Sequence, residues 1–229
     1  MTATLRAWVT PAIVGILVIA VLAVAVVRWR AHQERISQLE AQVKTLNATI
    51  ALLQTERSVY DSLAQDFGNT VEDIVDSAAS SSSDEVGIFE LHRLVETQQT
   101  FGNRIAKENS KVISMLGSYG NESWSGAVTG AIRSLATTID HASFLAGRAQ
   151  RALNSDDPYA VQAFFSSQVT EESSGQNIGD LMLKEKHQTT AVSSTLQAAI
   201  GKESSDLAPL QNQLAQSRDV NPPQAIFAP

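Results

Sequence analysis

The sequence contains no cysteine among its 229 residues. This absence excludes disulfide bonds, thiolate metal sites and cysteine nucleophiles together. The chain also lacks a glycine-rich phosphate loop, a nucleophile elbow and the histidine spacing of zinc proteases. Its histidines, which are His32, His92, His141 and His187, have no second ligand-type residue at a metal-binding spacing. We therefore expect no enzymatic activity, no cofactor and no metal ion.

Positive charge is scarce over most of the chain. Residues 61–229 hold eleven Lys/Arg against twenty-one Asp/Glu, whereas residues 1–60 hold six against three. An acidic body repels the phosphates of nucleic acid and the headgroups of anionic lipids. Nucleic acid is therefore not an expected partner.

No run of alternating apolar and polar residues is long enough to predict a strand. Apolar residues recur instead at helical spacing, first over a helix from about 86 to 117 and then over a second helix. The stripe of the second helix consists of Trp124, Val128, Ala131, Ile132, Leu135, Ile139, Ala142, Leu145, Ala149 and Leu153. These patterns predict an antiparallel helical bundle whose core includes Trp124, Ile132, Leu135, Ile139 and Leu145.

Residues 7–27 form a run without a charged side chain. At about 1.5 Å per residue, a helix of this length covers the hydrocarbon core of a bilayer. A cleaved signal peptide with a cut near residues 23–25 is the alternative. The run is longer than the usual apolar region of a signal peptide, and no polar stretch precedes the cut. We therefore expect a retained single-pass anchor in the cell membrane.

The residues beside this run indicate the orientation of the anchor. Arg28, Arg30, Arg35 and Lys44 follow it, whereas Arg6 and the α-amino group precede it. Arginine beside a span resists translocation, and this favours a cytoplasmic location for the body. The Ser-, Thr-, Asn- and Gln-rich composition of the body is more typical of exported domains. We favour the cytoplasmic side on the charge argument.

A heptad pattern follows the predicted anchor. Its a and d positions are Ile36, Leu39, Val43, Leu46, Ile50 and Leu53. β-Branched residues at a and leucine at d favour a parallel two-stranded coiled coil. The same frame continues less regularly through Tyr60, Phe67 and Ile74, with Gly68 inside it. The pattern predicts a parallel homodimer, while an antiparallel hairpin within one chain would use the same stripe.

The sequence therefore predicts an all-α chain, in which an N-terminal transmembrane helix continues into a coiled coil and a helical bundle follows. A serine-rich stretch and a proline-containing tail mark two of the boundaries. The expected parts are a membrane anchor (1–30), a coiled-coil rod (31–76), a serine-rich linker (77–85), a helical bundle (86–217) and an irregular tail (218–229).

Anchor, rod and bundle together suggest a membrane-tethered adaptor, scaffold or accessory subunit of a larger membrane complex. Residues 7–27 would contact the lipid bilayer, and the bundle would bind protein partners. Tyr159, Phe164 and Phe165 are the candidate partner contacts, because they are aromatic residues gathered in one short predicted helix. The alternative is a helical sensory or ligand-binding module that signals through the coiled coil with a partner protein.

Overall fold

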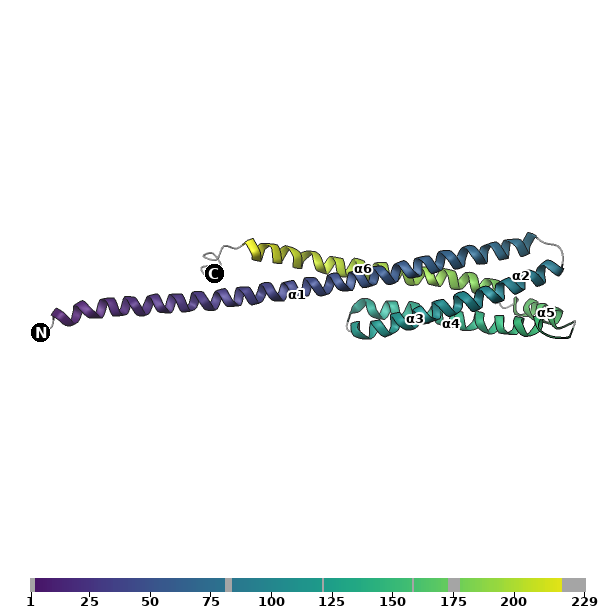
Figure 1. Ribbon diagram of the computed structural model, residues 1–229, viewed down its shortest axis with the longest axis horizontal. Helices are drawn as coiled ribbons and strands as arrows, with labels where there is room; N and C mark the ends of the chain where they lie inside the picture. The colour runs from purple at the N-terminus through teal and green to yellow at the C-terminus, as the bar shows by residue number, and fades with distance from the viewer. Residues whose placement is uncertain (1–2, 81–83, 121, 158, 173–177, 220–229) are drawn as a thin grey trace. The chain divides into compact units, whose positions relative to one another are not determined.

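The computed structural model describes residues 3–80, 84–120, 122–157, 159–172 and 178–219. Side chains are described over residues 19–77, 87–120, 122–157, 159–166 and 178–219. Every regular element in these ranges is helical and none of them is a strand, so the predicted all-α class is confirmed (Figure 1).

The described elements follow one another as α-helices with two short helical segments between them. In chain order they are α1 (Ala3–Ser80), α2 (Asp84–Thr97), the π-helical segment η1 (Gln98–Gly102), α3 (Asn103–Leu116), the 3-10 segment η2 (Gly117–Tyr119), α4 (Ser123–Leu153), α5 (Ala160–Glu172) and α6 (Ile178–Asp219). The expectation that residues 31–76 form one helix is confirmed, since α1 includes all of them.

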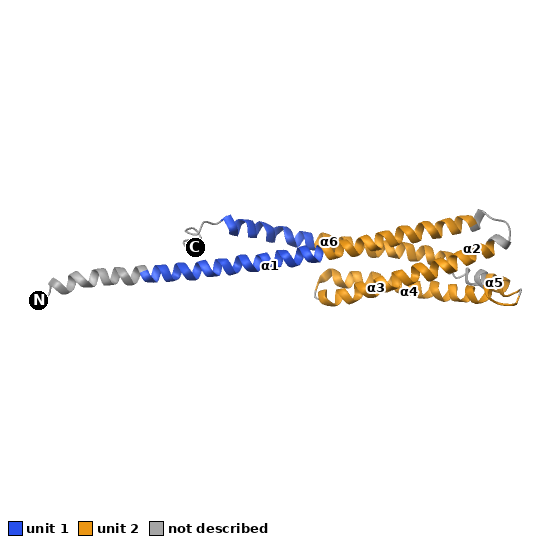
Figure 2. Cartoon of the chain, in the orientation of Figure 1, with its two compact units in different colours: residues 1–50, 203–229 blue, residues 51–202 orange. Residues whose placement is uncertain are grey.

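The chain divides into two compact units (Figure 2). Unit 1 comprises residues 1–50 and 203–229, and unit 2 comprises residues 51–202. Residues 51–76 of the predicted rod therefore belong to the same unit as α2 to α5. The serine-rich stretch contributes to two helices, because α1 ends at Ser80 and α2 begins at Asp84. Residues 220–229 of the predicted tail lie outside the described residues.

No helix in the part of the chain searched for a membrane span has both the length and the apolar character to be one. The side chains of residues 7–18, which are the first half of the predicted span, lie outside the described ranges. The second half is described, and its large apolar side chains are exposed. These are Ile19, Val21, Leu22, Val24, Val26 and Val27, with exposed fractions between 52% and 68%.

The core of unit 2 is built from apolar faces of five helices. One cluster of buried side chains joins α1, α2, α4, α5 and α6. It consists of Phe67, Val71, Ile74, Leu91, Leu94, Val95, Ala142, Leu145, Ala146, Ala149, Phe164, Ile178, Leu181 and Met182. The core prediction for α4 is confirmed, since Trp124, Ile132, Leu135, Ile139 and Leu145 are all buried.

Gly68, which interrupts the heptad frame, marks a close approach between α1 and α6. A Cβ atom at this position would lie 2.6 Å from Cε of Lys186. The Lys186 side chain passes over this glycine, and its Nζ contacts Oε1 of Glu72 at 2.5 Å. A larger side chain here would displace the stem of the lysine, which is the outer part of a flexible side chain.

In unit 1, the C-terminal part of α6 lies antiparallel to α1. Nε2 of His32 donates a hydrogen bond to the carbonyl oxygen of Ser217 at 3.0 Å. Nη2 of Arg218 contacts Oε1 of Glu40 at 2.6 Å. Leu207 and Leu214 of α6 are buried in this unit. A single chain thus already places two buried leucines of α6 in the same unit as the heptad stripe of α1.

Candidate functional site

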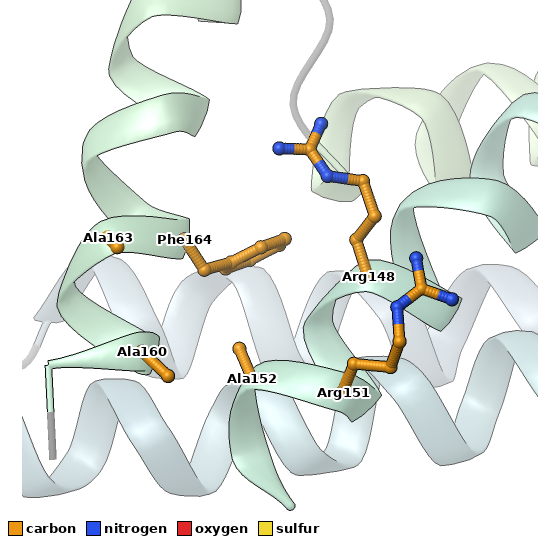
Figure 3. A pocket seen from close by; sticks show the side chains of 6 residues that line it. All are labelled: Arg148, Arg151, Ala152, Ala160, Ala163 and Phe164. Atoms are coloured by element: carbon orange, nitrogen blue, oxygen red, sulfur yellow. The ribbon is translucent and has the colours of Figure 1, made fainter. Parts of the chain in front are cut away.

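The groove between α4 and α5 has a volume of about 280 Å³ and lies at one edge of unit 2. It is lined by Arg148, Arg151 and Ala152 of α4 and by Ala160, Ala163 and Phe164 of α5. Figure 3 shows the Phe164 ring extending from α5 toward Arg148, with both arginine side chains on the same side of α4. The groove therefore joins two cationic groups to an apolar floor and wall.

The turn before α5 fixes the position of this helix against α4. The backbone N–H of Tyr159 donates to Oδ1 of Asp157 at 2.9 Å, and the N–H of Ala160 donates to the Asp157 carbonyl at 3.0 Å. The Asp157 N–H in turn donates to Oγ of Ser155 at 3.1 Å. Such side-chain caps satisfy backbone donors that a helix start leaves unpaired. Local sequence chemistry thus determines where α5 begins.

The groove has a recognisable chemical preference. A guanidinium group presents several N–H donors in a planar fork that matches a carboxylate or a phosphate. The alanine floor leaves room for a small apolar group beside that anion. Arg151 also lies in the last turn of α4, where a cation stabilises the helix dipole. Arg151 thus has a structural role that is independent of any ligand.

The three predicted partner-contact residues separate into two roles. Tyr159 is 70% exposed and Phe165 is 39% exposed, so both are accessible to a partner. Phe164 is only 5% exposed and belongs to the core cluster while forming the groove wall. The rings of Phe164 and Phe165 meet edge to face with centroids 6.0 Å apart.

Phe144 is a surface aromatic residue that sequence analysis did not single out. It lies one helical turn before Arg148 on α4 and is 63% exposed. Its position falls outside the apolar stripe of α4. An aromatic residue outside such a stripe is expected on the surface of a helix, and this could have identified Phe144 from the sequence. Phe144, Arg148 and Arg151 share one face of the helix, because their spacing follows the helical repeat.

The predicted coiled-coil residues are covered to different degrees. Leu39 and Leu53 are buried, whereas Ile36, Val43, Leu46 and Ile50 are half-buried. Leu53 lies in unit 2 and the other five lie in unit 1. The half-buried residues retain apolar surface beside α6, and pairing of this stripe with a second copy remains a prediction.

A polar cluster inside unit 2 joins α1 to α3. Nζ of Lys111 contacts Oε2 of Glu56 at 2.9 Å and Oε1 of Glu108 at 2.8 Å. The Tyr60 hydroxyl donates to Oδ1 of Asn109 at 2.7 Å. Burial raises the pKa of the Glu56 carboxyl and that of the Tyr60 hydroxyl. Because these groups are paired with one another, the cluster fixes the position of α3 along α1.

The described side chains contain no group of three or more His, Cys, Asp or Glu residues that could hold a metal ion. Comparison of the chain with protein-family models, with curated proteins and with solved structures gives no match.

Proposed function

We propose that this protein is a membrane-tethered, non-catalytic adaptor or scaffold that serves a larger membrane complex as an accessory subunit. The observation that carries the proposal is the exposed apolar row from Ile19 to Val27 in α1. Soluble surfaces rarely carry a contiguous apolar patch of this kind, because each exposed aliphatic side chain forgoes about 1.5–3 kcal/mol of burial. A lipid bilayer would cover the row on every side of the helix.

The proposal includes a single pass through the cell membrane, with the body on the cytoplasmic side. Arg28, Arg30 and Arg35 follow the apolar row directly, and Arg28 and Arg30 are exposed. Cationic side chains beside a span are retained on the cytoplasmic side during insertion. Protease added to intact cells should then leave residues 61–229 uncut. Digestion of these residues without lysis would show that the body lies outside the cytoplasm.

Self-association in parallel is the second part of the proposal. Two copies that enter a bilayer in the same direction present their α1 helices in parallel. The half-buried stripe residues Ile36, Val43, Leu46 and Ile50 supply the apolar surface for this pairing. Their β-branched and leucine alternation favours the two-stranded parallel form.

Partner docking is proposed at the edge of unit 2 formed by α4 and α5. Phe144 on α4, Tyr159 directly before α5 and Phe165 on α5 are exposed, and the groove between these two helices contains Arg148 and Arg151. Aromatic residues and arginine are enriched in the centres of protein interfaces. A protein segment with acidic and apolar side chains fits this surface.

Membrane attachment is tested by replacing Ile19 and Val24 with aspartate in the full chain. A charged residue at the centre of a span costs about 2.5–3.5 kcal/mol; Ile19 lies near the centre of residues 7–27 and Val24 adds a second charge nearer its end, so the two together should abolish insertion. The unmodified chain should remain in the membrane pellet after alkaline extraction, and the double aspartate variant should appear in the supernatant. A matched Ile19→Leu, Val24→Leu variant should stay in the pellet. Release of the unmodified chain by alkali would contradict the proposal.

The α4–α5 groove also supports a second candidate function, that of a ligand-binding module. The guanidinium groups of its two arginines and its alanine floor suit a small carboxylate or phosphate ligand. Calorimetric titration with inorganic phosphate and with butyrate, each against the full chain and against Arg151→Gln, tests this candidate. Heat that disappears in the variant favours the ligand-binding module, and no heat in either protein favours the adaptor alone.

A further inference from the structure

The C-terminal end of α6 is held beside α1 in unit 1. Nε2 of His32 donates a hydrogen bond to the carbonyl oxygen of Ser217 at 3.0 Å, and Nη2 of Arg218 lies 2.6 Å from Oε1 of Glu40. Both contacts lie within unit 1, where the end of α6 runs antiparallel to α1 (Figure 2). α6 therefore ends at the level of residues 32–40 of α1.

His32 also connects the end of α6 to a residue at the edge of the apolar run. Its ring lies 5.9 Å from the ring of Trp29, measured between the centroids. Tryptophan is enriched where a membrane meets water, because its ring is apolar and its N–H needs a polar partner. The Ser217 carbonyl is one of the last four of α6, which lack partners within the helix. One histidine thus joins a membrane-interface residue to a helix end.

The end of α6 lies close to the proposed membrane surface. Residues 32–40 begin five positions beyond Val27, which places them about 8–20 Å past the apolar run at roughly 1.5 Å per residue. The headgroup layer is about 5–8 Å thick on each side of a bilayer. If residues 7–27 cross the membrane, α6 therefore ends just above the headgroups.

The ten residues that follow α6, which are residues 220–229, have a composition that suits a membrane interface. They contain no charged side chain. Their large apolar residues are Val220, Ile226 and Phe227, and their prolines are Pro222, Pro223 and Pro229. Proline has no backbone N–H, so this segment brings fewer unpaired donors toward lipid than an ordinary chain does. A chain covers up to about 3.3 Å per residue, which is enough to reach the headgroup layer from the end of α6.

We propose that residues 220–229 bind the interface of the same bilayer that holds residues 7–27, so that the chain contacts the membrane at two places. The proposal rests on the proposed function, because the end of α6 has lipid beside it only if the chain is anchored. Ile226 and Phe227 meet the upper acyl chains, while backbone N–H groups find polar partners among headgroups and water. The hydrocarbon core is excluded as the site, since ten residues are too few to span it and the prolines disfavour a continuous helix.

A second membrane contact restrains unit 1. A single helix that crosses a bilayer can tilt and can rotate about its own axis. Attachment through residues 220–229 limits both motions, because the His32 and Arg218 contacts join α1 to the end of α6. The half-buried stripe of α1 then keeps a constant direction relative to the membrane, which assists pairing with a second copy.

The absence of cysteine makes this contact directly measurable. A single cysteine introduced by Ala225→Cys in the full chain is labelled with the fluorophore NBD, and the protein is placed in phosphatidylcholine vesicles. Phosphatidylcholine that carries a nitroxide near the top of its acyl chain quenches only fluorophores in or near the bilayer. The label at position 225 should lose about half of its fluorescence or more. A label introduced by Ser204→Cys, at an exposed position of α6 about 20 Å before Ser217, should lose little.

Paired substitutions test the apolar side chains. Ile226→Ser with Phe227→Ser, made in the Ala225→Cys chain, should remove most of the quenching, because these side chains supply the apolar surface. Asn221→Ser with Gln224→Ser is the matched control, since it changes as many residues without removing a large apolar side chain, and it should leave the quenching unchanged. Equal quenching in both double variants would overturn the proposal, as would an unquenched label at position 225.

A third label separates loss of this contact from loss of the anchor. Val24→Cys places the fluorophore within the proposed span, where it should be strongly quenched. Quenching at position 24 without quenching at position 225 would overturn the contact of residues 220–229 and leave the membrane anchor intact. Quenching at neither position would overturn both.

Discussion

Units 1 and 2 both use the heptad frame of α1, but they bury it to different degrees. In unit 1 the stripe residues Ile36, Val43, Leu46 and Ile50 are half-buried beside α6. In unit 2 the less regular positions, which include Tyr60, Phe67, Val71 and Ile74, are fully buried. The more regular stretch of sequence is therefore the less covered one.

The number of neighbouring helices explains this difference. Unit 1 brings one described helix, α6, to the side of α1. In unit 2, α1 shares a core with α2, α4, α5 and α6 and is joined to α3 by the bond between Tyr60 and Asn109. A heptad pattern identifies which face of a helix is apolar, whereas the elements around that face decide how completely it is covered.

The largest expected effect comes from removing a core ring in unit 2. Phe67→Ala should lower the free energy of unfolding by about 3–5 kcal/mol, because a fully buried aromatic side chain leaves a cavity. The variant also loses the contact between the Phe67 and Phe101 rings, whose centroids lie 5.5 Å apart. Urea unfolding in detergent, followed by circular dichroism, measures the change.

A matched truncation on the surface of the same unit is the control for this prediction. Phe144→Ala removes the same ring from an exposed site on α4 and should change stability by no more than about 0.5 kcal/mol. Leu46→Ala in unit 1 should fall between the two variants. If Phe67→Ala and Phe144→Ala cost the same, the distinction between covered and uncovered faces would be wrong.

The second effect is a pH-dependent change in the stability of unit 2. Glu185 of α6 is fully buried, and burial raises the pKa of its carboxyl group to about 7. Glu185→Gln should gain stability relative to the unmodified chain as pH rises from 4.5 to about 7. The gain should approach about 3 kcal/mol, since each unit of pKa corresponds to about 1.36 kcal/mol. Thermal unfolding of both proteins at a series of pH values measures the difference. A difference that stays constant with pH would contradict the raised pKa of Glu185.

The sequence was sufficient to predict the helical class and much of the core. The apolar stripe of α4 repeats at helical spacing, and its buried positions follow from that spacing alone. One α-helix was expected from about 86 to 117, and its apolar stripe is widely spaced between Val95 and Ile105. The structure has the π-helical segment η1 there, with Gln98 and Gly102 buried. A linear pattern did not predict η1, because its position depends on the helices that pack against it.

The candidate site was less accessible to sequence analysis than the fold. Tyr159 and Phe165 were recognised by residue type, but type alone did not separate them from buried Phe164. The groove depends on how α5 packs against α4, and its arginines resemble ordinary charges near the end of a helix. Glu185 was likewise one carboxylate among many until the burial of its helix face was known.

The third effect concerns self-association through unit 1. Leu46→Asp places a charge in the proposed parallel seam and removes apolar burial worth about 1.5–3 kcal/mol, so the dimer should weaken by at least tenfold. Analytical ultracentrifugation of the full chain in detergent measures the monomer–dimer equilibrium. Gln42→Asp is the matched control, because it introduces the same charge at an exposed position of α1. Monomeric unmodified chain at every concentration would show that the stripe serves α6 of its own chain alone.

The smallest expected effect compares ion pairs in the two units. Arg218 and Glu40 in unit 1 are both exposed, although Nη2 and Oε1 lie only 2.6 Å apart. An exposed pair gains little Coulomb energy in water and loses side-chain freedom, so Arg218→Ala should cost less than about 1 kcal/mol. Lys111 in unit 2 instead pairs with Glu56, whose side chain is buried.

Removal of Lys111 should therefore cost more than removal of Arg218, because Lys111→Ala leaves the Glu56 carboxylate in the interior without its cation. Salt distinguishes the two cases further: Lys111 is exposed, but its carboxylate partner Glu56 is buried, and mobile ions screen a pair with two exposed members more than a pair with one buried member. Urea unfolding of both variants at low and at high sodium chloride measures the costs. The Arg218→Ala cost should vanish at high salt while most of the Lys111→Ala cost remains. Equal costs with equal salt dependence would show that the ion pairs of the two units are equally exposed to solvent.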